Sequence, residues 1–278
     1  MKLSTDNLGK AFQHHVDNKG NTHTQTSVEP GSMKYFWLVA SLAPCIALAD
    51  EPGQWSIKFE GSSFQTIRND ARVPGNTGTE FSLKLLLGSA PKVAQYRYEI
   101  LYQQDADTTW RVLFAPLSIA GAGVLPNAVN FNGTTFNPGA TNGLYEFNSY
   151  RLSYLKRWWK SDRSDWKFGY TVKVRNARIQ LTQGALNETE SDPTGIVPLL
   201  TVRGEERLGD KWLMSFELDG LAAPQGRAFD LGLSIGYDVS DRARAYAGVR
   251  LLEGGASNDK VFTFAQFHYL TFGTSWRF

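Results

Sequence analysis

The last eighteen residues, Val261–Phe278, read VFTFAQFHYLTFGTSWRF and decide the fold. Counting back from the end in twos gives an almost wholly apolar set: Phe278, Trp276, Thr274, Phe272 and Leu270. The residues between them are small or polar: Arg277, Ser275, Gly273 and Thr271. A repeat of two is the side-chain repeat of a β-strand. The stretch therefore predicts a strand with one apolar and one polar face, which ends the chain on an aromatic residue.

Composition agrees with a membrane β-barrel. The 278 residues hold 29 Lys+Arg and 27 Asp+Glu, and this near-balance predicts no nucleic-acid partner. The mean hydropathy of −0.32 does not argue against a membrane, because lipid-facing and interior residues alternate in a barrel and cancel in the average. Aromatic residues make up 13% of the chain, and 26 residues are glycine. Cys45 is the only cysteine, so no intrachain disulfide can form.

The apolar run over residues 35–49, YFWLVASLAPCIALA, predicts a secretory signal. Its fifteen residues fall short of the ~20 that a transmembrane helix needs. Lys34 precedes it and Ala47-Leu48-Ala49 closes it, so we predict a signal peptide over 33–49, cleaved after Ala49. A lipoprotein signal at Cys45 is the alternative, which Pro44 disfavours. Residues 1–32 are polar and predict a disordered or mis-annotated extension, which leaves 50–278 as the barrel.

Beyond residue 54 the chain repeats the alternating pattern between turn clusters. We predict about twelve strands, with ten or fourteen as alternatives, including a strand over 80–87 and a weak strand over 128–136. The Gly121–Gly123 stretch predicts a turn. The longer segments 61–79, 137–143, 183–196, 221–227 and 253–260 are expected to face outside, since barrels have short periplasmic turns and longer outer loops.

Tryptophans give an independent indication, because they favour the membrane–water interface. Six of them fall near the termini or the predicted periplasmic turns and form a predicted aromatic girdle: Trp55, Trp158, Trp159, Trp166, Trp212 and Trp276. Trp110 falls beside a loop predicted on the opposite side. A soluble β-sandwich also alternates, but it needs neither this clustering nor a signal peptide. In lipid a closed barrel satisfies every backbone group. We therefore predict an all-β, antiparallel up-and-down transmembrane barrel in the bacterial outer membrane.

Two strings resemble loops of an uncharacterised family of proteobacterial outer-membrane barrels: Leu221–Arg227 (LAAPQGR) and Leu252–Asp259 (LEGGASND). The resemblance covers most of residues 54–278. It implies the barrel fold and the outer-membrane location, with membrane lipids as partners, and it implies no activity and no catalytic residue. The closing strand with Phe278 is predicted to be the insertion signal that the barrel-assembly machinery reads.

Charged residues fall on the predicted interior face of the strands. The residues expected to line the interior are Arg97, Arg111, Arg151, Lys167, Lys173, Arg175, Arg244, Arg250, Glu99 and Glu217, with Glu80, Asp219 and Asp230 on the same face. They predict either a ladder of ion pairs that fills a narrow barrel, or the wall of a water-filled pore. Basic residues on neighbouring strands would favour anions in such a pore. Twelve-strand channels for acidic oligosaccharides are similar in architecture only.

The leading functional hypothesis is therefore a narrow passive channel for small solutes, with anions favoured. One alternative is a plugged barrel with a structural or loop-mediated binding role. The other is a lipid-modifying hydrolase using His268, the one histidine of residues 50–278 and a weak catalytic candidate. His268 lies between Phe267 and Tyr269, without a nearby serine at His-x-Ser spacing, and has lipid-facing parity. The sequence predicts no metal site and no cofactor.

Overall fold

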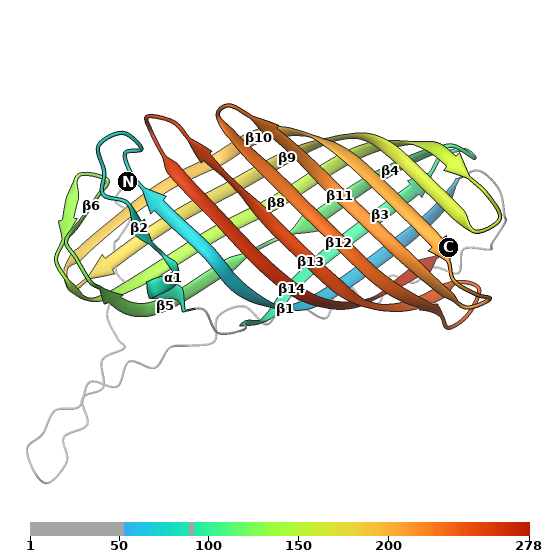
Figure 1. Ribbon diagram of the computed structural model, residues 1–278, viewed down its shortest axis with the longest axis horizontal. Helices are drawn as coiled ribbons and strands as arrows, with labels where there is room; N and C mark the ends of the chain where they lie inside the picture. The colour runs from blue at the N-terminus through green and yellow to red at the C-terminus, as the bar shows by residue number, and fades with distance from the viewer. Residues whose placement is uncertain (1–52, 89–91) are drawn as a thin grey trace, which may run out of the picture. The chain divides into compact units, whose positions relative to one another are not determined.

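The computed structural model describes residues 53–88 and 92–278, so the predicted extension and signal peptide lie outside the described residues. The described chain forms one closed antiparallel barrel of ten strands (Figure 1). The wall consists, in order, of β1 (Gln54–Arg72), β3 (Lys92–Gln103), β4 (Thr108–Ala115) continued by β5 (Ser118–Leu125), β8 (Gly139–Lys160), β9 (Ser164–Gln183), β10 (Leu186–Arg207), β11 (Trp212–Ala223), β12 (Gly226–Asp238), β13 (Ala243–Ser257) and β14 (Phe262–Arg277). The predicted all-β barrel is confirmed, with the ten-strand alternative in place of twelve.

The closing strand pairs with the first strand, as a closed barrel requires. The β1–β14 ladder runs from Ser56↔Arg277 to Arg72↔Phe262, with one register shift between Thr66 and Arg68. The backbone N–H of Phe278 donates to the carbonyl of Trp55 at 2.9 Å, one step beyond the ladder. This closure pairs the two ends of the sheet, so neither the first nor the last strand is left as a free edge along this ladder.

Neither of the two surplus predicted strands spans the wall. Residues 80–87 form a short strand β2 (Phe81–Ser82), paired with the end of β1, and a single helical turn α1 (Lys84–Leu87), because their apolar side chains except Leu85 are buried in the barrel mouth. Residues 128–136 form a separate hairpin of β6 (Val129–Phe131) and β7 (Thr134–Phe136). Its Asn132-Gly133 turn has positive φ at both residues, which suits a tight two-residue turn.

The predicted turn at Gly121–Gly123 is wrong, because these residues lie inside β5 and pair with β8. The glycines leave room for the backbone of α1 to pack closely against β5. A Cβ on Gly121 would come 2.6 Å from the carbonyl oxygen of Leu86, and a Cβ on Gly123 would overlap the carbonyl of Leu85. Only residues without a side chain allow backbone this close to the wall.

The two ends of the barrel differ in their connections. The turn end holds the first residue of β1, the last of β14 and the turns 104–107, 161–163, 208–211 and 239–242. The loop end holds the segment 73–88, the connection 126–138 and the three remaining hairpins. Several predicted outer loops are strand, because the β9–β10 ladder continues to Gln183↔Leu186 and the β13–β14 ladder to Ser257↔Phe262. Among the described residues, no helix is long and apolar enough to cross a membrane.

Candidate functional site

The outer face of the barrel is apolar. Alternate wall residues expose large hydrophobic side chains, such as Ile57, Leu152, Val172, Val249 and Phe272, each between 45% and 56% exposed. Tryptophans gather at the turn end. Trp110 belongs to this group and does not sit by an opposite-side loop as predicted, since β4 starts at the turn end and pairs Trp110 with Tyr154. An apolar band bordered by aromatic residues is the surface of a barrel that spans a lipid bilayer.

The middle of the interior is filled by a network of ion pairs, named here the central layer. It joins six basic side chains with five acidic ones: Lys58, Arg97, Arg111, Arg151, Arg203 and Arg250, with Glu60, Glu99, Glu217, Asp219 and Asp230. Nine of the eleven side chains are at most 8% exposed. The void inside the layer is about 10 Å³, roughly the space for one water molecule. The central layer therefore closes the interior across its axis.

Each carboxylate of the layer meets more than one base. Asp219 accepts hydrogen bonds from Arg111 at 2.8 and 2.6 Å and from Arg151 at 2.6 Å. Glu217 accepts from Lys58 at 2.5 Å, from Arg203 at 2.9 Å and from Arg250 at 3.1 Å. Sharing of this kind offsets the cost of removing the charges from water, and the layer retains an excess of one positive charge.

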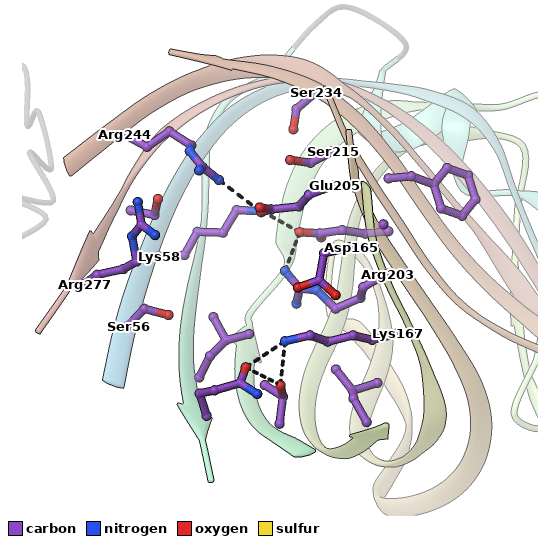
Figure 2. Close-up of a pocket in the computed structure, with 18 of the residues that line it drawn as sticks. Ser56, Lys58, Asp165, Lys167, Arg203, Glu205, Ser215, Ser234, Arg244 and Arg277 are labelled. Atoms are coloured by element: carbon purple, nitrogen blue, oxygen red, sulfur yellow. Dashed lines mark hydrogen bonds and ion pairs between the residues drawn. The ribbon is translucent and has the colours of Figure 1, made fainter. Parts of the chain in front are cut away.

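A polar pocket of about 210 Å³ lies between the central layer and the turn end, named here the turn-end vestibule (Figure 2). Its lining includes Lys58, Asp165, Lys167, Arg203, Glu205 and Arg244. Lys167 donates hydrogen bonds to Gln103 and Thr109, both at 2.7 Å. Arg244 pairs with Glu205 at 3.0 Å and with Asp238 at 2.7 Å. The basic residues of the vestibule thus have partners on the wall.

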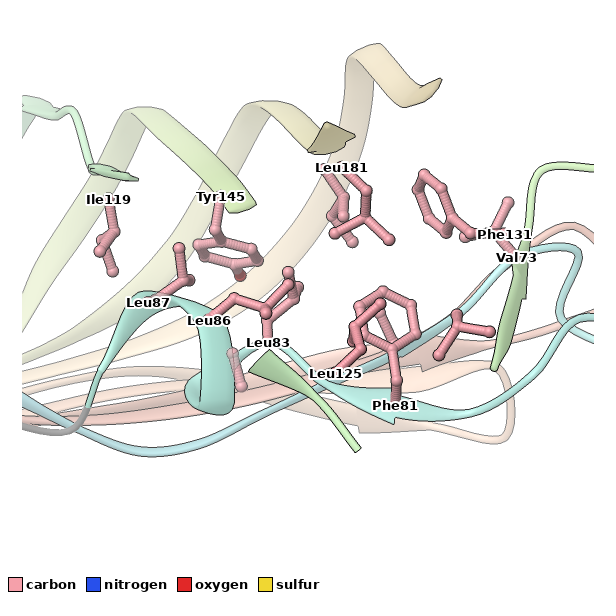
Figure 3. Packing of buried hydrophobic residues seen from close by; sticks show 14 of the residues in the cluster. Val73, Phe81, Leu83, Leu86, Leu87, Ile119, Leu125, Phe131, Tyr145 and Leu181 are labelled. Atoms are coloured by element: carbon pink, nitrogen blue, oxygen red, sulfur yellow. The ribbon is translucent and has the colours of Figure 1, made fainter. Parts of the chain in front are cut away.

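Apolar side chains fill part of the interior on the loop side, and they form what we name the plug: the segment Val73–Leu87 with the β6–β7 hairpin. Figure 3 shows Leu86 and Leu87 turned toward Tyr145 on the wall. Phe131 and Phe136 of the hairpin are fully buried. The ring of Phe81 meets that of Phe131 edge-on, with 5.8 Å between centroids. This packing anchors the plug inside the mouth of the barrel.

A second cavity, of about 370 Å³, lies on the loop side of the central layer and is named here the loop-end cavity. Most of its lining is apolar, including Phe147, Val197, Leu221, Ala228, Leu252 and Phe267. Three basic residues of β9 also reach it, and one of them, Arg178, pairs with Glu146 at 2.7 Å. Arg175 pairs with Asp192 at 2.7 Å, whereas Lys173 is 2% exposed and holds its ammonium 4.5 Å from the centre of the Phe147 ring.

The wall is unpaired beside this cavity. The β10–β11 ladder ends at Leu200↔Gly220, although β10 stays paired with β9 as far as Leu186 and β11 with β12 as far as Ala223. We name this gap, between residues 196–199 of β10 and 221–223 of β11, the lateral opening. Pro198 has no N–H to offer to a neighbouring strand. Residues from both sides of the opening line the loop-end cavity, so the opening lies beside the cavity.

The lateral opening lies at membrane depth. Ile196 is eight residues along β10 from Gly204, which pairs with Trp166 of the aromatic end. Eight residues of a tilted strand rise about 20 Å along the membrane normal, within an apolar band about 25 Å tall. Ile196 is 68% exposed on the outer face.

Comparisons with known proteins agree with the barrel and add no activity. No family model matches the chain, and no curated protein matches it. The outer-membrane protease OmpT from Escherichia coli is 11% identical, with 84% of this chain and 99% of that chain covered and a TM-score of 0.47. Ail, the attachment invasion locus protein of Yersinia pestis, is 10% identical, with 81% and 99% covered and a TM-score of 0.34. Likenesses this weak carry no argument about what the chain does.

The fold and the apolar outer face of the chain itself decide its class. The protein is a bacterial outer-membrane β-barrel. In such barrels the short turns face the periplasm, so the loop end of this barrel faces outside.

The structure distributes the predicted interior residues over three levels. The central layer holds Arg97, Arg111, Arg151, Arg250, Glu99 and Glu217, the turn-end vestibule holds Lys167 and Arg244, and the loop-end cavity holds Lys173 and Arg175. Glu80 is the exception, because it lies exposed beside Arg72 at 3.5 Å and not on a wall strand. The central layer also holds three residues that were not predicted: Lys58, Glu60 and Arg203. The sequence did carry a signal for the first two, because they alternate with the apolar residues Trp55, Ile57 and Phe59.

The predicted girdle and the weak catalytic candidate lie on the outer surface. Trp55, Trp158, Trp159, Trp212 and Trp276 are each at least 50% exposed, and Trp166 is half-buried beside them. His268 is exposed on β14, where its Nε2 lies 3.0 Å from Nε2 of Gln266. Within residues 53–88 and 92–278 no three His, Cys, Asp or Glu side chains group as a metal site.

Proposed function

We propose that this outer-membrane barrel is a plugged binding protein, which takes a small apolar molecule from the outer leaflet into its loop-end cavity. The observation that carries the proposal is the position of that cavity. It is separated from the turn end by the central layer, and it borders the lateral opening at membrane depth. A volume of about 370 Å³ falls in the range of small-ligand pockets, roughly 300–1,000 Å³.

The narrow anion channel is a less favoured function for this geometry. Its proposed basic wall is divided, because Arg151 is held by Asp219 and Asp230 while Lys167 and Arg175 lie at opposite ends of the interior. An open pore would require the twelve ion pairs of the central layer to separate. Planar-bilayer recordings discriminate the two functions: we expect no steady ion current from the wild-type protein, and a steady anion-selective current would favour the channel.

Binding of a neutral, apolar fluorescent probe such as N-phenyl-1-naphthylamine tests the cavity. Ala177→Phe places a ring in the loop-end cavity and is expected to weaken probe binding at least tenfold. Ala247→Phe is the matched control, because it adds the same ring to an exposed position on the lipid-facing surface of β13. Equal binding by both variants would place the probe elsewhere and contradict the proposal.

A disulfide across the lateral opening tests the route. Pro198→Cys with Ala222→Cys, in a Cys45→Ser background, places two cysteines opposite each other if the β10–β11 register is extended past Leu200↔Gly220. Oxidation is expected to slow probe uptake at least tenfold, and a reductant is expected to restore it. Val202→Cys with Leu218→Cys is the control, four residues away on the paired part of the same ladder.

Unchanged uptake with the bond confirmed by mass would exclude the lateral route. If the bond does not form, Ala223→Trp is expected to block the same opening from the cavity side. Normal probe uptake by that variant would also exclude the lateral route.

A further inference from the structure

Lys173 is the feature of the loop-end cavity that its apolar walls do not explain. It lies on β9, paired with Arg151 of β8 on one side and Val197 of β10 on the other. The neighbouring inward residue of β8, Arg151, belongs to the central layer, so Lys173 lies at the floor of the cavity. Its side chain is only 2% exposed, and its ammonium lies over the ring of Phe147. Lysine is rarely this buried without a counter-ion.

The protein supplies no counter-ion to Lys173 among the described residues. No carboxylate oxygen of those residues lies within 4.0 Å of its Nζ. Asp219 and Asp230 of the adjacent layer are each held by arginines, and Asp192 is held by Arg175 at 2.7 Å. A cation–π contact recovers part of the lost hydration, but a buried charge is well stabilised only by an opposite charge or several hydrogen bonds.

The inference that follows rests on the proposed function. We propose that Lys173 binds the carboxylate of a single-chain aliphatic acid whose hydrocarbon chain lies in the loop-end cavity. The ammonium is a single point donor at the closed end of an apolar cavity, so it suits a small monoanionic head group at the end of a chain. A dianionic phosphate would call for arginine forks, and the arginines in and beside the cavity already pair with carboxylates: Arg151 and Arg175 with aspartates, Arg178 and Arg227 with glutamates.

The charge of the central layer, taken together with Lys173 beside it, favours an acidic ligand. The central layer has six basic and five acidic side chains, and Lys173 raises the excess to two positive charges. A bound carboxylate would offset one of them next to side chains of the layer that are themselves buried. The lateral opening lets the acid keep its chain in an apolar environment between the membrane and the cavity.

Displacement of the neutral probe by dodecanoate and by dodecanol tests the inference. Wild-type protein is expected to bind the acid about tenfold to a hundredfold more tightly than the alcohol, the range for a charge-assisted hydrogen bond. Lys173→Met is expected to abolish this preference, and comparing acid with alcohol within the variant makes the readout independent of any change in probe affinity. Lys167→Met is the matched control, since Lys167 lies on the same face of β9 but in the turn-end vestibule.

The outcomes separate the two proposals. If the probe does not bind wild-type protein at all, the proposed function fails. If the probe binds but dodecanoate and dodecanol displace it equally, or Lys173→Met keeps the preference, only the inference on Lys173 is overturned. Tighter, Lys173-dependent displacement by dodecyl phosphate would overturn the carboxylate assignment. Lys173→Arg, which keeps the charge, is expected to retain acid preference and serves if Lys173→Met fails to fold.

Discussion

Arg111 donates two hydrogen bonds to Asp219 across the interior, from β4 to β11, with Nη2 at 2.8 Å from one carboxylate oxygen and 2.6 Å from the other. The same carboxylate accepts from Arg151 of β8 at 2.6 Å and from the hydroxyl of Thr201 of β10 at 2.8 Å. One carboxylate therefore ties four strands together at the middle of the barrel.

Asp219→Ala is expected to destabilise the barrel by about 3–5 kcal/mol, the cost of breaking a buried ion pair, because it leaves two arginines without their shared partner. Urea unfolding in detergent micelles, followed by tryptophan fluorescence, measures the change. Glu205→Ala is the control. Glu205 is 53% exposed and pairs with Arg244 at 3.0 Å, so its loss is expected to cost at most about 1 kcal/mol. Equal costs would mean that the central layer does not hold the barrel together.

Gly123→Ala tests the close contact between α1 of the plug and β5 of the wall. A Cβ at this position would overlap the carbonyl of Leu85, so α1 must shift from the wall. We expect a loss of about 1–3 kcal/mol, as for overpacked interiors, measured by the same unfolding assay. Gly209→Ala is the control, because a Cβ there meets nothing within 4 Å and the residue lies in a turn. A neutral Gly123→Ala would show that α1 does not depend on close contact with β5.

Two buried tyrosines are expected to respond differently to loss of their hydroxyl groups. Tyr246 donates to the carbonyl of Phe59 or the carboxylate of Glu60, each at 3.3 Å, whereas the hydroxyl of Tyr269 has no partner among the described residues. Tyr246→Phe should therefore cost about 0.5–1.5 kcal/mol, and Tyr269→Phe should be neutral or stabilising. Unfolding midpoints of the two variants give the comparison. A larger loss for Tyr269→Phe would reveal a partner for its hydroxyl, such as a bound water.

The sequence predicts the wall of this barrel well, because wall strands must alternate between lipid and interior. That constraint repeats along β1, β8, β12 and β14. In β1 it places Lys58 and Glu60 on the interior face and Ile57 and Phe59 on the lipid-facing face, although Lys58 and Glu60 were not among the predicted interior residues. Alternation also places the charges inside. It does not reveal which charges meet, because the partners Arg111 and Asp219 are 108 residues apart and meet only after closure.

The plug misled the sequence interpretation for a physical reason. Phe81, Leu83, Leu85 and Leu87 alternate like a wall strand, but three of the four are buried inside the mouth in a short strand and one helical turn. Local periodicity cannot distinguish a face toward lipid from a face toward the interior when both are apolar. Counting residues 80–87 as a wall strand also reversed the predicted directions of the next two strands, β3 and β4. The prediction therefore placed Trp110 of β4 at the wrong end of the barrel.

Phe278 is the last residue of the predicted insertion signal. Its side chain is 44% exposed at the turn end, and its N–H donates to Trp55, so its removal costs the folded barrel one terminal hydrogen bond. We expect deletion of Phe278 to leave refolding in detergent nearly unchanged but to reduce assembly in cells, with unfolded chain accumulating in the periplasm. Fractionation and heat-modifiable migration measure this, and Phe278→Tyr, which keeps an aromatic end, should assemble normally. Normal assembly of the deletion variant would show that the assembly machinery recognises this barrel through another part of β14.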